Sequence, residues 1–212
     1  MPRALLSVLA AFALALAAAA PAAAQDGPLP ALYDVRGVAP DDVLNVRAAP
    51  SADAARIGAL APGAQGVEVT AIDSAAGWGR VNAGEQAGWV SMRFLARQPR
   101  QGGNALPVPM RCFGTEPFWS LSVAEDGLRL EGPGVPRAVT ASLSERTRAA
   151  GRPDAYGFVG WGAGGGQAIH GTVRRARCSD GMSDRLFGLS ADLLVQDGGA
   201  LRQYAGCCTL AR

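Results

Sequence analysis

The sequence contains no lysine, because all 20 of its basic residues are arginine. Schiff-base chemistry, a phosphate-binding Walker lysine and a Ser-Lys dyad are therefore excluded. The chain also has a single histidine, His170, so it cannot supply the two or three histidine ligands of many zinc sites. Any Ser/His or Cys/His dyad within one chain would have to use His170.

Long apolar runs are absent except at the N-terminus. Arg3 supplies a short positive region, and residues 4–20 contain only Ala, Leu, Val, Phe and one Ser. Small residues at 22–24 then resemble a signal-peptidase site. The run is too short and too rich in alanine for an anchor, which needs about 20 apolar residues. We expect a signal peptide over 1–24, a periplasmic or secreted protein, and no membrane span after signal removal.

Cysteine is absent from the first half of the chain, and no C-x-x-C occurs anywhere. An even number of cysteines in an exported protein predicts two structural disulfides rather than a redox or metal-binding thiol set. A bond between adjacent cysteines would be strained, so Cys207 and Cys208 are each expected to pair with a distant partner, Cys112 or Cys178. A bond from Cys112 to either of them would staple the ends of the second half. The choice between them stays open.

Both halves are predicted to be all-β, because short alternating apolar segments are separated by Gly, Pro and Asp and no long helical period with caps occurs. The proline- and glycine-containing stretch 98–110 predicts a linker between them. Residues 25–99 carry 6 Arg and 8 acidic residues, whereas 100–212 carry 13 Arg and 10 acidic residues. This mild asymmetry, without a dense arginine and aromatic stripe, predicts no nucleic-acid binding.

Several spaced elements in the first half resemble the bacterial Src-homology-3-like (SH3b) domain. They include Leu44-Asn45-Val46-Arg47, Gly77-Trp78, Gly88-Trp89-Val90 and Phe94-Leu95. The resemblance covers residues 32–97. It implies a small five-stranded barrel that binds peptidoglycan or its peptides.

Contact residues can be assigned within this predicted domain. Trp78 follows a small-residue loop and offers a flat stacking surface, while Arg47 and Arg80 are suited to the carboxylates of a wall peptide. Trp89 lies in an apolar run and is expected in the core. Gly77 and Gly88, each before a tryptophan, are expected where the chain bends tightly.

The second half, 111–212, is predicted to be a disulfide-stapled antiparallel β barrel or sandwich. Its segments Cys112–Leu121 (CFGTEPFWSL) and Cys178–Arg185 (CSDGMSDR) resemble a family of exported bacterial proteins without settled activity. This resemblance supplies no catalytic residues. The glycine run 160–166 lacks the lysine of a phosphate loop and is expected to be a hairpin tip. It presents Trp161 as a second candidate contact residue.

Polar residues of the second half provide no assembled catalytic or metal site. Glu116, Asp180, Asp184 and His170 are potential ligands, but the spacing lacks the third acidic position and final glutamate of an EF-hand. We therefore predict no metal and no cofactor. His170 lies in an alternating strand, where packing is the simpler role, and no Gly-x-Ser-x-Gly occurs. The arginines at 174, 175 and 177 form a basic cluster that can lie on a solvated face or contact an acidic envelope polymer.

The leading interpretation is a non-enzymatic, exported cell-envelope protein. Its first domain would contact peptidoglycan or a peptide, and its second would present a surface to an envelope protein or ligand. One alternative is a cell-wall hydrolase that uses His170, Glu116 and Asp180. Another is a secreted inhibitor that inserts loop 179–185 into a lytic enzyme, which requires Met182 to be exposed.

Overall fold

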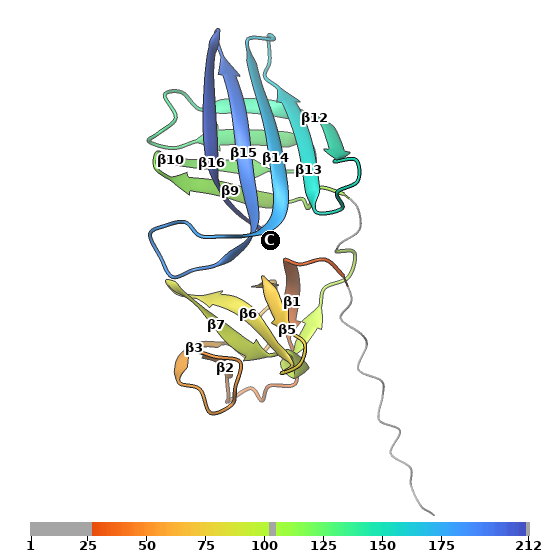
Figure 1. Ribbon diagram of the computed structural model, residues 1–212, viewed down its shortest axis with the longest axis vertical. Helices are drawn as coiled ribbons and strands as arrows, with labels where there is room; N and C mark the ends of the chain where they lie inside the picture. Colours follow the sequence, from red (N-terminus) through yellow and green to blue (C-terminus); the bar gives the residue numbers. More distant parts are fainter. Residues whose placement is uncertain (1–26, 102–104, 211–212) are drawn as a thin grey trace, which may run out of the picture.

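The computed structural model describes residues 27–101 and 105–210. Two β units lie one above the other, and the segment between strands β14 (Gln167–Cys178) and β15 (Phe187–Asp197) reaches from the upper unit to the lower (Figure 1). The predicted signal peptide, 1–24, lies outside the described residues. In the described parts of the chain, no helix is long and apolar enough to cross a membrane.

The N-terminal unit contains two small antiparallel sheets. One has the order β4-β1-β8, and the other has the order β3-β2-β7-β6-β5. The elements are β1 (Ala31–Val35), β2 (Leu44–Arg47), β3 (Arg56–Leu60), β4 (Val67–Val69), β5 (Ala71–Asp73), β6 (Trp78–Ala83), β7 (Gln86–Ser91), the 3₁₀ turn η1 (Met92–Phe94) and β8 (Leu95–Arg97). The inward residues of both sheets, Tyr33, Val46, Val69, Val81 and Val90 among them, form one core. The N-terminal unit is therefore all-β, as predicted, and both of its sheets pack on one core.

Glycines in this unit serve two different purposes. Gly77 has a φ of 72°, so it forms the tight turn expected before Trp78. Gly88 instead lies inside β7 with its hydrogen atoms toward the core. A Cβ there would lie 2.5 Å from the Cγ1 atom of Val46 and 2.8 Å from the Cδ1 atom of Ile57. The expected bend at Gly88 is therefore wrong, because close strand packing and not a turn requires this glycine.

The C-terminal unit is a closed antiparallel barrel with the order β10-β11-β12-β13-β14-β15-β16-β9. Its strands are β9 (Met110–Thr115), β10 (Phe118–Val123), β11 (Gly127–Glu131), β12 (Val139–Arg148), β13 (Ala155–Trp161), β14 (Gln167–Cys178), β15 (Phe187–Asp197) and β16 (Ala200–Leu210). Alternate residues point inward and form one apolar core that includes Trp119, Leu121, Tyr156, Ile169 and Leu193. The closed barrel resolves the predicted choice between barrel and sandwich.

Two disulfides stabilise the barrel, and both join distant residues as predicted. Cys112 of β9 bonds to Cys208 of β16, which lies directly opposite it where the two strands close the barrel. Cys178, the last residue of β14, bonds to Cys207. The neighbouring cysteines point to opposite sides of β16, so one bond fastens the closure and the other anchors the segment that leaves β14.

The segment between β14 and β15 attaches the barrel to the hairpin of β6 and β7. The Asp184 N–H donates to the Glu85 carbonyl oxygen at 2.9 Å, and the Ala87 N–H donates to the Asp184 carbonyl oxygen at 3.0 Å. The Asn82 amide accepts from the Leu186 N–H at 3.0 Å and donates to the Leu186 carbonyl oxygen at 3.2 Å. The two units are therefore joined by a short length of strand-like pairing.

A partly buried carboxylate forms a second contact between the units. Glu68 of β4 accepts hydrogen bonds from the Thr209 hydroxyl and, at 3.2 Å, from the Leu210 N–H of β16. Burial raises the pKa of Glu68, and these two hydrogen bonds offset part of that rise. The Glu68 side chain is therefore protonated at a higher pH in the folded chain than in the unfolded chain.

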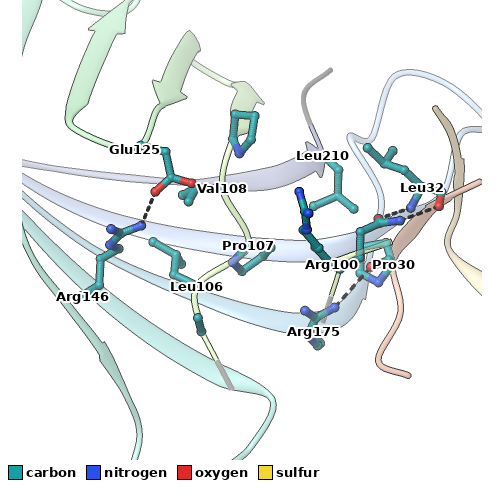
Figure 2. A pocket seen from close by; sticks show the side chains of 13 residues that line it. Pro30, Leu32, Arg100, Leu106, Pro107, Val108, Glu125, Arg146, Arg175 and Leu210 are labelled. Atoms are coloured by element: carbon teal, nitrogen blue, oxygen red, sulfur yellow. Dashed lines mark hydrogen bonds and ion pairs between the residues drawn. The ribbon is translucent and has the colours of Figure 1, made fainter. Parts of the chain in front are cut away.

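The described residues of the predicted linker 98–110 contact both units, because Gln101 hydrogen-bonds to Leu32 of β1 and Leu106 packs in the barrel. Leu106 is 4% exposed and belongs to the barrel core, and Val108 packs beside it. The segment borders a cavity of about 340 Å³ between the units (Figure 2). At the rim of this cavity the Arg175 guanidinium donates to the Pro30 carbonyl oxygen at 3.3 Å.

Removing the two disulfides separately should cost different amounts of stability. The Cys112–Cys208 bond spans 96 residues and the Cys178–Cys207 bond spans 29. In the chain-entropy model, such loops contribute about 4.7 and about 3.6 kcal/mol to the free energy of unfolding. The double variants C112A/C208A and C178A/C207A, unfolded in urea, should show losses in that order. A larger loss for C178A/C207A would contradict the closure role of Cys112.

The pKa of Glu68 predicts how stability depends on pH. Because the pKa of Glu68 is raised in the folded chain, protonation of Glu68 adds to the free energy of unfolding. This stabilisation is fully present below the ordinary pKa of 4.5 and is lost as pH rises through the raised value. The free energy of unfolding of the wild type should therefore fall across that interval. Glu68→Gln keeps an oxygen acceptor without the charge, so it should flatten this part of the profile. Identical slopes for the two proteins would contradict the assignment.

Candidate functional site

A groove of about 520 Å³ opens on the N-terminal unit, bordered by the loop after β1, the end of β2, the start of β6 and η1. Its lining includes two of the predicted contact residues, Trp78 and Arg47. The complete lining is Gly37, Val38, Ala39, Asp42, Val43, Leu44, Asn45, Arg47, Ala52, Trp78, Ser91, Arg93 and Phe94. Residues separated by more than thirty positions in the sequence are thus brought to one concave surface.

Trp78 is held at the edge of this groove by backbone pairing. It is the first residue of β6 and lies opposite Ser91 of β7. The Gly77 N–H donates to the Asp73 carbonyl oxygen at 2.8 Å, which closes the turn that delivers the indole ring. Trp78 is partly exposed and does not belong to the core cluster. Its ring is therefore available as an apolar, flat contact surface.

Two arginines give the groove its positive charge. Arg47 ends β2, and its guanidinium donates to the Ala54 carbonyl oxygen at 2.7 Å, which fixes the side chain and leaves other N–H groups free. Arg93 lies on η1 with its guanidinium 4.4 Å from the centre of the Phe94 ring. Asp42 is the acidic residue of the lining. The site combines an aromatic surface with guanidinium groups suited to a carboxylate.

Arg93 was not identified from the sequence. The sequence signal that could have found it is a basic residue immediately before the Phe94-Leu95 pair, which the SH3b resemblance already includes. Its position in the groove depends on the 3₁₀ turn, which returns the chain toward the loop after β1.

Arg80 and Trp89 lie beside the groove, on the outer face of the same sheet. They are direct cross-strand neighbours, and the Arg80 guanidinium is 6.0 Å from the centre of the indole ring. Arg80 also donates to the Thr70 hydroxyl at 3.2 Å. Burial, together with the nearby charge of Arg177, lowers the pKa of Arg80. The structure therefore does not bring Arg80 into the groove lining with Arg47.

The expectation of a core position for Trp89 is wrong. Its neighbours Gly88 and Val90 are buried, and successive residues of a strand point to opposite faces. Trp89 therefore faces outward, where it is partly covered by Arg80 and lies outside the core cluster.

Trp161 occupies a separate position on the barrel. It is the last residue of β13, is 49% exposed, and meets the His170 ring edge-on at 5.6 Å between centroids. The glycine run that follows it forms the turn to β14, with φ values of 84° at Gly164 and 76° at Gly165. Trp161 thus belongs to a different surface from the groove at Trp78.

The residues considered for catalysis are not gathered at one place. Glu116 and Asp180 line the same shallow cavity of about 260 Å³, beside the Cys178–Cys207 bond. His170 lies opposite Val159 and Leu194, eight positions before Cys178 in β14. At about 3.3 Å per residue, the strand places it about 26 Å from the end that carries Cys178. The structure does not assemble His170, Glu116 and Asp180 into one site.

The basic cluster before Cys178 is only partly free. Arg175 donates to the Tyr156 hydroxyl at 2.9 Å and to the Pro30 carbonyl oxygen, so it joins the units. Arg174 and Arg177 are exposed. Across residues 27–101 and 105–210, no group of three or more His, Cys, Asp or Glu side chains is arranged to hold a metal ion.

Comparisons with known proteins agree with the architecture of the N-terminal unit. A search of curated proteins and a search of solved structures gave no significant match. Residues 42–96, which carry the groove-lining parts of β2, β6 and η1, match the family described as the bacterial SH3 domain.

Proposed function

We propose that this protein is an exported binding protein of the cell envelope, and that the groove at Trp78 holds peptidoglycan or one of its peptides. Bacterial SH3 domains are commonly binding modules for the cell wall, and residues 42–96 form such a domain. The observation that carries the proposal is the convergence of Trp78, Arg47 and Arg93 on one groove of about 520 Å³.

The chemistry of the groove suits such a ligand. A wall peptide is flexible, carries carboxylates and has apolar methyl groups along its backbone. The Trp78 ring offers a surface for the apolar parts, while Arg47 and Arg93 offer N–H donors to a carboxylate. Arg80 lies outside the groove lining, so it is not assigned a contact with the ligand.

Export is supported by the cysteines. All four are paired in disulfides, and such bonds persist in extracellular and periplasmic compartments. The barrel then serves as an interaction module for an envelope protein, and Trp161 is a second candidate contact on it.

Replacing Trp78 should remove most of the wall binding. An aromatic anchor of this kind contributes at least about 2 kcal/mol, so Trp78→Ala should weaken retention of residues 25–212 on purified cell wall by about thirtyfold or more. Cosedimentation at increasing wall concentration gives the affinity. Leu201→Ala is the matched control, because Leu201 is 67% exposed at the far β15–β16 hairpin.

The same experiment separates the two candidate surfaces. Retention that is insensitive to Trp78→Ala but lost in Trp161→Ala would place the contact on the barrel and contradict the groove. Retention that survives both substitutions would contradict an aromatic contact altogether.

The arginines predict a dependence on salt. Raising NaCl from about 50 to about 500 mM shortens the screening length to less than half and should weaken retention. Arg93→Gln removes one exposed charge, so it should weaken binding about two- to fivefold at low salt and reduce the salt dependence. Arg56→Gln changes an exposed arginine outside the groove and serves as the control. Equal salt slopes for wild type and Arg93→Gln would contradict the role of Arg93.

A further inference from the structure

The two unusual segments of the second half, Cys112–Leu121 and Cys178–Arg185, meet at a groove of about 440 Å³. This groove lies at the junction of the units and is separate from the groove at Trp78. Its floor is the outer face of β9 and β10, where Phe113 lies opposite Ser120 and Thr115 lies opposite Phe118. Its walls are the loop 179–186, the hairpin tip at Glu85, and Gly132 and Pro133.

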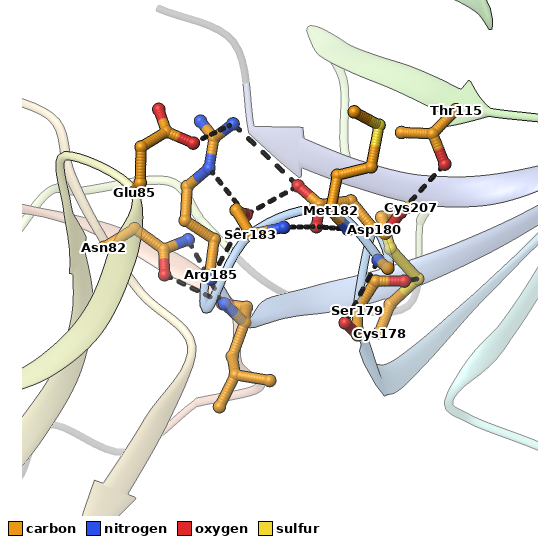
Figure 3. A network of polar contacts seen from close by, with 12 residues as sticks. Asn82, Glu85, Thr115, Cys178, Ser179, Asp180, Met182, Ser183, Arg185 and Cys207 are labelled. Atoms are coloured by element: carbon orange, nitrogen blue, oxygen red, sulfur yellow. Dashed lines mark hydrogen bonds and ion pairs between the residues drawn. A yellow bond between two sulfur atoms is a disulfide. The ribbon is translucent and has the colours of Figure 1, made fainter.

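The groove presents large apolar side chains to solvent. Phe118 is 51% exposed and Met182 is 66% exposed, although both belong to well-packed segments. Met182 projects from the polar network of its loop on the side of Thr115 (Figure 3). The exposure required by the loop-insertion alternative is therefore present, but the side chain lines a concave surface. Adjacent exposed aromatic and methionine side chains are typical of protein-binding surfaces.

The loop that carries Met182 is rigidly held. The Asp180 carboxylate accepts from the Met182 N–H at 3.1 Å, the Ser183 N–H at 2.9 Å and the Ser183 hydroxyl at 2.8 Å. The Thr115 hydroxyl donates to the Asp180 carbonyl oxygen at 2.8 Å. Burial opposes ionisation of Asp180, but these hydrogen bonds prevail and hold its pKa below the usual value. The disulfide at Cys178 fixes the base of the loop.

The two arginines at the rim of the groove, Arg185 and Arg111, differ in their surroundings. Arg185 lies 3.6 Å from the Glu85 carboxylate and 3.8 Å from the Asp180 carboxylate, so its charge is balanced within the loop and hairpin. Arg111 is exposed on the outer face of β9, and its guanidinium makes no hydrogen bond or ion pair with another of the described residues. A ligand that enters the groove therefore meets the aromatic side chains of the floor next to the exposed guanidinium of Arg111.

We propose that this groove binds an extended segment of a partner protein that carries a large apolar side chain next to an aspartate or glutamate. The apolar side chain packs between Phe118 and Met182, and the carboxylate pairs with Arg111. Because the loop is already ordered, binding does not carry the entropic cost of ordering it. A short segment with few contacts can therefore bind. The proposal is independent of wall binding at Trp78.

Panning a random-peptide display library on the full mature chain tests this directly. The enriched peptides should share a large apolar residue beside an acidic one. Phe118→Ser and Met182→Ser should each weaken a selected peptide by about tenfold or more, whereas Leu201→Ser, at a residue with similar exposure far from the groove, should not change it. Trp78→Ala should also leave peptide binding unchanged.

Reversal of the rim charge gives the sharpest readout. Peptides selected on the Arg111→Glu variant should carry a basic residue beside the apolar anchor in place of the acidic one.

Near-ultraviolet circular dichroism and intact disulfides establish that each variant is folded. Met182→Ser, at an exposed loop position, still tests the groove if Phe118→Ser does not fold. An unchanged acidic preference, enrichment without an apolar anchor, or no enrichment would overturn the proposal. Concentration-dependent dimerisation abolished by Met182→Ser would also overturn it, because the occupant would then be a second copy of the chain.

Discussion

The alternation of side chains along β6 and β7 is the constraint on which the candidate binding surface depends. Buried residues at 79, 81, 88 and 90 occupy the inner face, two of them glycines that let the other strands approach closely. The residues between them must face outward, and these include both tryptophans of the domain and Arg80. The core therefore determines which aromatic and cationic groups remain available. The turn at Gly77 and the 3₁₀ turn η1 then place Trp78 and Arg93 in the lining of one groove.

The closed barrel applies the same principle to a second surface. Its inner face is filled by apolar side chains, so the outer face of β9 and β10 carries the distinctive residues Phe113, Thr115 and Phe118. The loop between β14 and β15 covers part of this face while it pairs with the β6–β7 hairpin through Asp184. One loop thus joins the units, forms a wall of the apolar groove and presents Met182. A change that detaches this loop should disturb the junction and the groove together.

Much of this architecture follows from the sequence. The sequence predicts the all-β class and the SH3-like domain because turn residues and strand alternation are local patterns. It predicts two disulfides to distant partners because the number of cysteines is even and adjacent cysteines rarely bond to each other. The disulfide pairing required the barrel register, which places Cys112 opposite Cys208. Trp89 was misassigned because an apolar run hides which face each residue takes. Arg93 and the Phe118–Met182 groove were missed because they arise from contacts between distant segments, which no local pattern encodes.

A ligand bound in the groove at Trp78 should change the NMR signals of the residues that line it. Titration of the isotopically labelled chain with a soluble peptidoglycan fragment, followed by amide and indole NMR signals, tests this most directly. The account predicts the largest shifts at the Trp78 indole, at Arg93 and along the loop 37–45. Shifts confined to the barrel, or no shifts at saturating fragment concentration, would contradict it.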